Sequence, residues 1–180
     1  MSGFQLNVNE LMKKATVFHR HICPGLVLGV LAAKYALEHG FEHSPDEEIV
    51  AVVETDNCSV DALQILLSTT YGKGNLIHKD YGKNNYNIYN RKTQKGIRLA
   101  LKQEISNYKD LPRDEKIQKL LELEPESVFD IREIEFNPPG LALIDESVPC
   151  KMCGELTMES RIMDYQGKKI CIPCYKESRK

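Results

Sequence analysis

Apolar positions near the start of the chain recur with the period of a helix. From Pro24 to Gly40 they return every three or four residues, and a proline that opens a helix and a glycine that closes it mark the two ends. A first helix precedes this one, because Asn7 or Asn9 can cap a segment that runs to about Phe18. The pattern therefore predicts two consecutive helices.

Shorter apolar runs predict strands between further helices. Ile49–Val53 is rich in β-branched residues and is typical of a buried strand, and a third helix opens at Ser59. The remaining predicted elements are a hairpin of residues 87–91 and 97–101, a helix over 113–123, a turn from Pro125 and a strand over 131–136. Helices mixed with antiparallel strands indicate an α+β core domain.

A cluster of backbone breakers separates this domain from the rest. Asn137-Pro138-Pro139-Gly140 ends any regular element. We therefore predict an α+β core domain over residues 1–140 and a small domain over 141–180, with the linker at about 137–149.

Composition and charge narrow the class of protein. The chain has 180 residues, of which 42% are apolar and 28% charged, as in globular proteins. Its net charge of −2 favours neither nucleic acid nor an anionic membrane as a partner. The longest uncharged apolar stretch, Ile22–Ala33, is too short to span a bilayer, and the N-terminus lacks the pattern of a secretory signal. We expect a soluble, cytoplasmic protein without a membrane partner.

Four of the six cysteines have the spacing of a zinc site. They form two C-x2-C pairs, Cys150 with Cys153 and Cys171 with Cys174. Two such knuckles, joined by a return hairpin of residues 158–163 and 168–172, predict a zinc ribbon in which four thiolates hold a structural zinc. The module is basic but poor in aromatic residues, so docking onto a protein or onto the core domain is favoured over nucleic acid.

The other two cysteines lie near histidines. His19, His21 and Cys23 alternate along the chain, so an extended connector lets all three side chains converge. Cys23 and Cys58 both precede a predicted helix, where partial positive charge favours the thiolate that binds metals or attacks electrophiles. These residues suggest a His/Cys metal site or a thiolate–imidazole pair, although a single cysteine behind a strand, such as Cys58, is more often a small core residue.

A glycine-flanked lysine follows the third helix. In Tyr71–Leu76 the backbone N–H groups and Lys73 can hold an anion, although the P-loop spacing is absent and an ordinary turn also explains the glycines. The remaining histidines stand alone and are interpreted as surface or capping residues: His39, His43 and His78.

Several of these segments resemble one known family. The run from His19 to Gly29 resembles the H-G-H-x-C-P-G-x-x-x-G opening of the FmdE-like family, named after the E component of formylmethanofuran dehydrogenase, with Arg20 in place of the usual glycine. Thr69 stands where relatives are expected to carry a third cysteine. The other matching segments, in order, are residues 54–62, 72–76, 80–83 and 89–91.

The resemblance implies an α+β core, a homodimer and a metal pocket. Its site would comprise His19, His21, Cys23 and Cys58, surrounded by Asp61, Lys73, Asn75 and Lys83. The parent system is a molybdenum or tungsten pterin enzyme that reduces CO2 onto methanofuran in methanogenic archaea, in which the E component is accessory. The other components of that enzyme are the implied partners.

Three hypotheses follow for the function. In the first, the chain is an oxidoreductase subunit in which Cys23, Cys58 and His21 are catalytic and Lys73 neutralises an anionic small-molecule ligand. In the second, the same residues only bind or deliver a metal, whose identity a His/Cys donor set leaves open among zinc, iron, nickel and copper. In the third, the chain is a zinc-ribbon adaptor whose core is only a scaffold.

Overall fold

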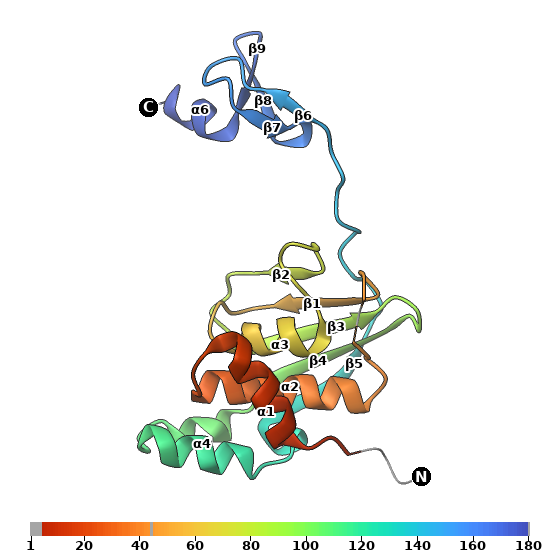
Figure 1. The fold of residues 1–180 in the computed structure, drawn as a ribbon, viewed down its shortest axis with the longest axis vertical. Coiled ribbons are helices and arrows are strands. Elements are labelled where there is room, and N and C mark those ends of the chain that lie inside the picture. Colours follow the sequence, from red (N-terminus) through yellow and green to blue (C-terminus); the bar gives the residue numbers. More distant parts are fainter. Residues whose placement is uncertain (1–4, 44, 180) are drawn as a thin grey trace. The chain divides into compact units, whose positions relative to one another are not determined.

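A five-stranded sheet with helices on one face forms the larger part of the molecule (Figure 1). The computed structural model describes residues 5–43 and 45–179. These residues fall into two compact units that divide between Ala142 and Leu143, which is two residues after the predicted boundary. Each unit is described by itself.

The helices of the first unit begin and end close to the predicted residues. They are α1 (Val8–His19), α2 (Pro24–Glu38), α3 (Ser59–Leu67), the 3-10 helix η1 (Gln103–Tyr108), α4 (Arg113–Leu121) and α5 (Pro125–Val128). Asn7 caps α1, and its side-chain oxygen accepts hydrogen bonds from the N–H groups of Asn9 and Glu10. The sequence prediction missed η1.

The sheet combines one parallel pair with an antiparallel meander. Its strands are β1 (Ile49–Val53), β2 (Leu76–His78), β3 (Asn85–Asn90), β4 (Lys95–Leu101) and β5 (Phe129–Ile134), in the order β2-β1-β3-β4-β5. The predicted hairpin is confirmed as β3 and β4, with Ile88 opposite Ile97. The strand β2 was not predicted; it runs parallel to β1, and α3 is the crossover between them.

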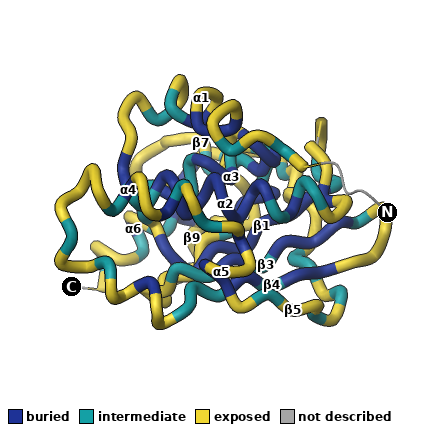
Figure 2. The backbone as a smooth tube through the Cα atoms, turned by 90° about the horizontal axis from the view of Figure 1, so that it is seen from below, coloured by how far each residue is buried: buried dark blue, intermediate teal, exposed yellow. Residues whose placement is uncertain are grey.

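The core lies between the sheet and the helices. Buried residues concentrate along α2 and along the strands that it faces (Figure 2). Nearly every residue of α2 from Leu26 to Ala36 is buried, because α1, α3 and α4 pack around it. The periodic stripe predicted from the sequence therefore underestimates how far α2 is enclosed.

The second unit is built from two hairpins and a short helix. Its elements are β6 (Ser147–Pro149), β7 (Leu156–Met158), the 3-10 helix η2 (Glu159–Arg161), β8 (Ile162–Tyr165), β9 (Lys168–Cys171) and α6 (Ile172–Glu177). The predicted return hairpin is present as β8 and β9, in which Ile162 lies opposite Cys171.

Among the described residues, no helix combines the length and the apolar character that crossing a bilayer requires.

Candidate metal centres

The end of α1 and the start of α2 place two of the candidate ligands. His19 is the last residue of α1, and Arg20 then turns the chain in a left-handed conformation with φ of 70°. Cys23 caps α2, and its Sγ accepts the backbone N–H of Leu26 at 3.4 Å. The thiol therefore has the role that serine or aspartate usually has at a helix start.

Two glycines of α2 let the third helix approach. A Cβ atom at Gly29 would overlap the backbone of Ser59, so only glycine fits where α2 crosses α3. A Cβ atom at Gly25 would lie 3.3 Å from the Cβ atom of Cys58. This close crossing brings Cys58, at the start of α3, next to Cys23 at the start of α2.

The four predicted ligands converge in the core domain. One ligand atom from each of His19, His21, Cys23 and Cys58 lies within 4.8 Å of all the others. Nε2 of His19 is 3.9 Å from Sγ of Cys23, and the two imidazole rings are 4.2 Å apart at their centroids. Ligands around a tetrahedral metal at about 2.0–2.3 Å are roughly 3.3–3.8 Å apart, so a small inward movement suffices to bind an ion. The donor set fits zinc and other borderline-soft metals.

Asp61 orients the first histidine. Its Oδ2 atom is 2.7 Å from Nδ1 of His19, and its other oxygen accepts a hydrogen bond from Gln64 at 3.2 Å. Since Nδ1 faces the carboxylate, Nε2 is directed at the thiols. A carboxylate behind a histidine is the usual outer partner of a metal-binding imidazole.

The two thiols differ in their surroundings. Cys58 lies at the cap position of α3 but makes no capping hydrogen bond, and Asn57 accepts the N–H of Ser59 instead. Burial, and after it the neighbouring Cys23 thiol, raise the pKa of Cys58. The sequence prediction of a helix start that favours the Cys58 thiolate is therefore wrong for the chain without metal. A bound cation would reverse the shift, because a coordinating thiol loses its proton.

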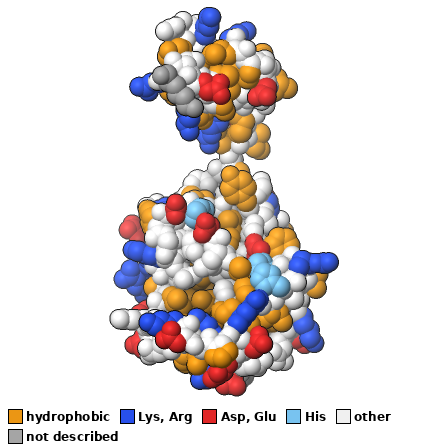
Figure 3. Space-filling model, turned by 90° about the vertical axis from the view of Figure 1, so that its left-hand side faces the viewer, with side chains coloured by type: hydrophobic (Ala, Val, Ile, Leu, Met, Phe, Trp, Pro, Cys, Tyr) orange, Lys and Arg blue, Asp and Glu red, His pale blue; other side chains and the backbone are white. Residues whose placement is uncertain are grey.

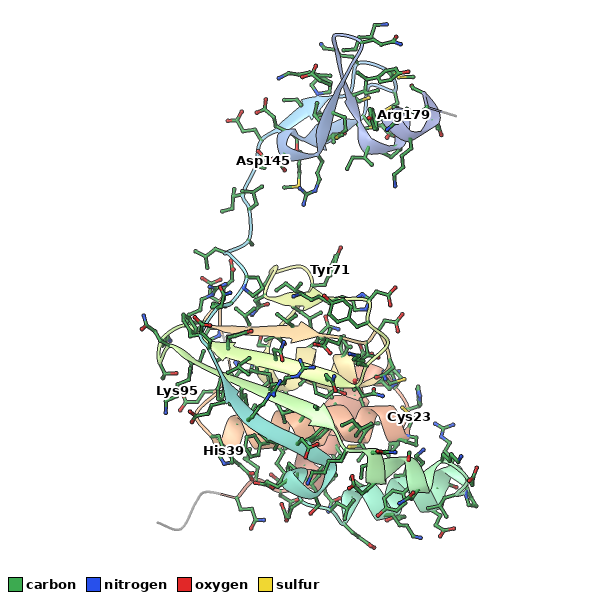
Figure 4. All side chains as sticks on the ribbon, turned by 180° about the vertical axis from the view of Figure 1, so that it is seen from behind. Cys23, His39, Tyr71, Lys95, Asp145 and Arg179 are labelled. Carbon is green, nitrogen blue, oxygen red and sulfur yellow. The ribbon has the colours of Figure 1, made fainter. Side chains whose placement is uncertain are left out.

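A cavity of about 420 Å³ adjoins this cluster. It lies at the carboxyl ends of the parallel strands β1 and β2, where His78 is paired with Val53. Its lining comprises His19, Val53, Thr55, Asp56, Asn57, Cys58, Val60, Asp61, Gln64, Tyr71, Leu76 and His78. Histidine side chains are visible on the surface of the core domain in Figure 3, and Tyr71 is labelled at the loop before β2 in Figure 4.

His78 was interpreted from the sequence as a surface residue. Although it is exposed, it is also part of the cavity lining, which the sequence interpretation missed. The signal that could have placed it is the order strand, helix, strand from Ile49 to His78, because a parallel pair brings both carboxyl ends to one edge.

The lysines and the asparagine assigned to the site are not among the residues that line the cavity. Nζ of Lys73 donates to the carbonyl of Asp46 and to Oγ of Ser68, and the buried Asn75 amide donates to the carbonyls of Ile49, Asp46 and Ser68. Asn75 also accepts the N–H of Thr70 at 2.8 Å. These contacts fasten the loop before β2. Lys83 is exposed, and its N–H donates to the carbonyl of Glu54.

Thr69, at the position expected for a cysteine, is buried. Its hydroxyl donates to the carbonyl of Leu63 at 3.2 Å, which helps to close the C-terminal end of α3. In this chain the position therefore serves the helix end.

The second unit holds four thiols as one group. The Sγ atoms of Cys150, Cys153, Cys171 and Cys174 lie within 4.8 Å of one another. Backbone N–H groups, chiefly those of Cys153 and Cys171, lower the pKa of Cys150 to about 6, as expected for a thiolate ligand. The neighbouring thiols, Cys171 first, raise the pKa of Cys174 to about 12, so a cation is needed to hold all four as thiolates.

The second cysteine pair differs from the prediction in its backbone. Cys171 caps α6 and Cys174 lies within its first turn, whereas the sequence analysis expected a second knuckle. Pro173 explains the helix, because proline is favoured in a first turn. Knuckle, hairpin and helix is the order found in treble-clef fingers, and the four thiols still converge.

Together the fold and the donor groups define a class: an α+β protein with one His/Cys group and one four-cysteine group, each able to hold a metal ion. The family model described as "FmdE, Molybdenum formylmethanofuran dehydrogenase operon" matches residues 18–132, which include the whole His/Cys group. The chain therefore belongs to the FmdE family, as the resemblance of its motifs predicted.

Two known proteins are similar over nearly the whole chain. A protein named "Probable S-adenosyl-L-methionine-binding protein" from Archaeoglobus fulgidus is 33% identical over 201 residues, which cover 94% of this chain and 54% of that protein. The chain thus spans about half the length of this relative. The crystal structure of an FmdE-like protein of tungsten formylmethanofuran dehydrogenase from Syntrophus aciditrophicus matches 97% of this chain and 95% of its own, with a TM-score of 0.71 and 24% identity. It supports the fold.

Proposed function

We propose that the core domain is a binding site for one transition-metal ion, held by His19, His21, Cys23 and Cys58. The observation that carries the proposal is the hydrogen bond between Asp61 and Nδ1 of His19, which presents Nε2 to two thiols that come from two other helix starts. A packed core has no other evident use for a histidine aligned in this way.

The four residues would hold the ion with different firmness. His19 is oriented by Asp61 and Cys23 by the N–H of Leu26, whereas His21 is exposed. A divalent ion in this place supplies a Lewis acid that polarises a coordinated atom. Chemistry would require a free coordination position, and His21 is the ligand whose release costs least. A fixed His21 would instead make the chain a binding or delivery protein.

In the second unit we propose a structural zinc on the four thiols. Four protein ligands leave no position for a substrate, and the unit has a hydrophobic cluster of only a few residues around Ile170. Metal binding would then supply much of its folding free energy.

The partners proposed for the chain follow from the family. We propose a homodimer and, as in the system after which the family is named, a role beside a molybdenum or tungsten enzyme as an accessory component. Binding of S-adenosyl-L-methionine is in the name of a relative about twice as long, and nothing in the present site favours it over another ligand. Light scattering of the purified chain tests the dimer.

The experiment that tests the metal site is elemental analysis of the full chain. We expect two metal equivalents per wild-type chain, one from each group, and one equivalent in Cys23→Ser and in His21→Ala. His39→Ala is the matched control, since His39 stacks on Tyr35 away from the cluster, and it should keep both. Two equivalents retained in Cys23→Ser would refute the assignment, and one equivalent in wild type would favour the adaptor hypothesis.

A further inference from the structure

We propose that the cavity beside the core cluster binds a small molecule with a planar ring and a neutral or positive charge, and that His78 and Asp56 recognise it. The inference deepens the proposed function and rests on it, because the His/Cys cluster forms one wall of the cavity. His78 belongs to no metal group among the described residues.

The place of the cavity in the fold favours a ligand. It opens at the carboxyl ends of β1 and β2 and at the start of α3, the crossover helix between them. In sheets with parallel strands, ligands bind at this edge, because the loops that leave the strands diverge there. Its volume of about 420 Å³ is that of a small metabolite.

The walls suit a flat, partly apolar body. Val53, Val60 and Leu76 provide apolar surface, and two ring-bearing side chains, Tyr71 and His78, come from the loop before β2 and from its last residue. Tyr71 is 81% exposed, which is unusual for a large aromatic residue and leaves its ring faces accessible. Aromatic faces stack on planar ligands.

The charges argue against an anion. The lining includes two carboxylates and two imidazoles, and within the described part of the chain neither a lysine nor an arginine lines the cavity. Asp61 is engaged by His19, but Asp56 is exposed at the rim. A divalent ion with two thiolate ligands adds no net positive charge. The anion that the sequence analysis assigned to Lys73 therefore meets no lysine or arginine from the described lining, whereas an ammonium group would meet Asp56.

Three probes of similar simplicity test the charge preference. Histamine carries a ring and an ammonium group, imidazole carries the ring alone, and inorganic phosphate is an anion. Amide NMR spectra of the zinc-loaded full chain should show saturable shifts for residues 55–61 and for His78 with histamine and with imidazole, at Kd values of about 1 mM or tighter. Phosphate should give none.

Variants separate the two recognition groups. His78→Ala should weaken both ring-bearing probes about fivefold, and Asp56→Asn should weaken histamine about threefold while leaving imidazole unchanged, as expected for one exposed charge pair. His39→Ala should change neither. Saturable phosphate shifts at the same amides, or unchanged affinities in His78→Ala, would overturn the proposal.

The metal content of each sample keeps this test apart from the previous one. Absence of shifts in a chain whose core cluster holds its metal would refute the ligand site alone. A wild-type chain that binds no metal at the core cluster would refute the proposed function itself.

Discussion

Gly29 of α2 lies directly against the backbone of Ser59 in α3, so closely that a methyl group at Gly29 would overlap it. This contact fixes the separation of two helices whose first turns carry Cys23 and Cys58. A packing detail in the middle of a helix thereby sets the geometry of the thiols.

Gly29→Ala should therefore damage both stability and the core site. Because the added methyl group meets backbone rather than a flexible side chain, we expect a loss of about 2–3 kcal/mol in the free energy of unfolding. That corresponds to a decrease of about 4–10 °C in Tm. Thermal unfolding and metal content measure the two effects. Gly72→Ala is the control, since a methyl group there has no neighbour within 4 Å; equal Tm values for the two variants would contradict the prediction.

Asp61→Asn should weaken metal binding without unfolding the chain. An asparagine keeps the shape but loses the charge that orients the His19 ring and increases its basicity, which typically costs 10- to 100-fold, or roughly 1.4–2.8 kcal/mol, in metal affinity. Competition with a chromogenic zinc chelator measures the change. Asp164→Asn, in the second unit, should leave the core affinity unaltered. An unchanged affinity in Asp61→Asn would mean that the histidine needs no outer partner.

The ion pair between Glu54 and Arg98 should make stability depend on pH. The guanidinium binds both carboxylate oxygens, at 2.7 and 3.0 Å, and this hydrogen bonding lowers the pKa of Glu54. A lowered pKa stabilises the fold at pH values above the pKa of Glu54 in the unfolded chain, and the contribution is lost as the pH falls through the lower folded-state pKa.

Urea unfolding of wild type and Glu54→Gln as a function of pH measures this effect. We expect a loss of about 1.5–3 kcal/mol in the variant at neutral pH, and a smaller difference in acid. Glu115→Gln removes an exposed pair with Lys119 and should cost no more than about 0.5 kcal/mol. Parallel pH profiles for wild type and Glu54→Gln would rule out the pair as the cause.

Cys174→Ser should unfold the second unit alone. The unit has few buried apolar residues, so losing one of four thiolates should expose it to protease while the core keeps its Tm. Cys58→Ser is the reciprocal variant, which should lose the core metal and leave the second unit resistant. Limited proteolysis followed by mass spectrometry distinguishes the two results, and a protease-resistant second unit in Cys174→Ser would contradict a structural role for the metal.

Local signals account for the parts of the fold that were predicted. Pro24, Asn7 and the β-branched run at Ile49 act within one or two turns of their own positions, so their elements are readable from sequence. The strand β2 has three residues, too few for a pattern, and its parallel pairing with β1 depends on a distant partner. The hairpin of β3 and β4 was readable because both strands lie on either side of one polar turn.

The candidate site follows the same rule. The alternation of His19, His21 and Cys23 is local and suggested convergence. The hydrogen bond of Asp61 to His19 spans 42 positions, and the sequence suggested Asp61 only through a family resemblance. Lys73 and Asn75 match the family motif equally well, but in this chain they bind the backbone and side chains of their own loop and its neighbours. A motif therefore identified the region of the site more reliably than the role of each residue.

The position of His19 as the last residue of α1 has a consequence for the mobility of that helix. An ion at the core cluster would link His19 at once to the starts of α2 and α3, so it would act as a clasp that holds α1 to the rest of the core. Amide hydrogen exchange in α1 should then slow when metal is added and return to its fast rate when metal is removed. The first helix would thus report, without any ligand or partner, whether the core site is filled.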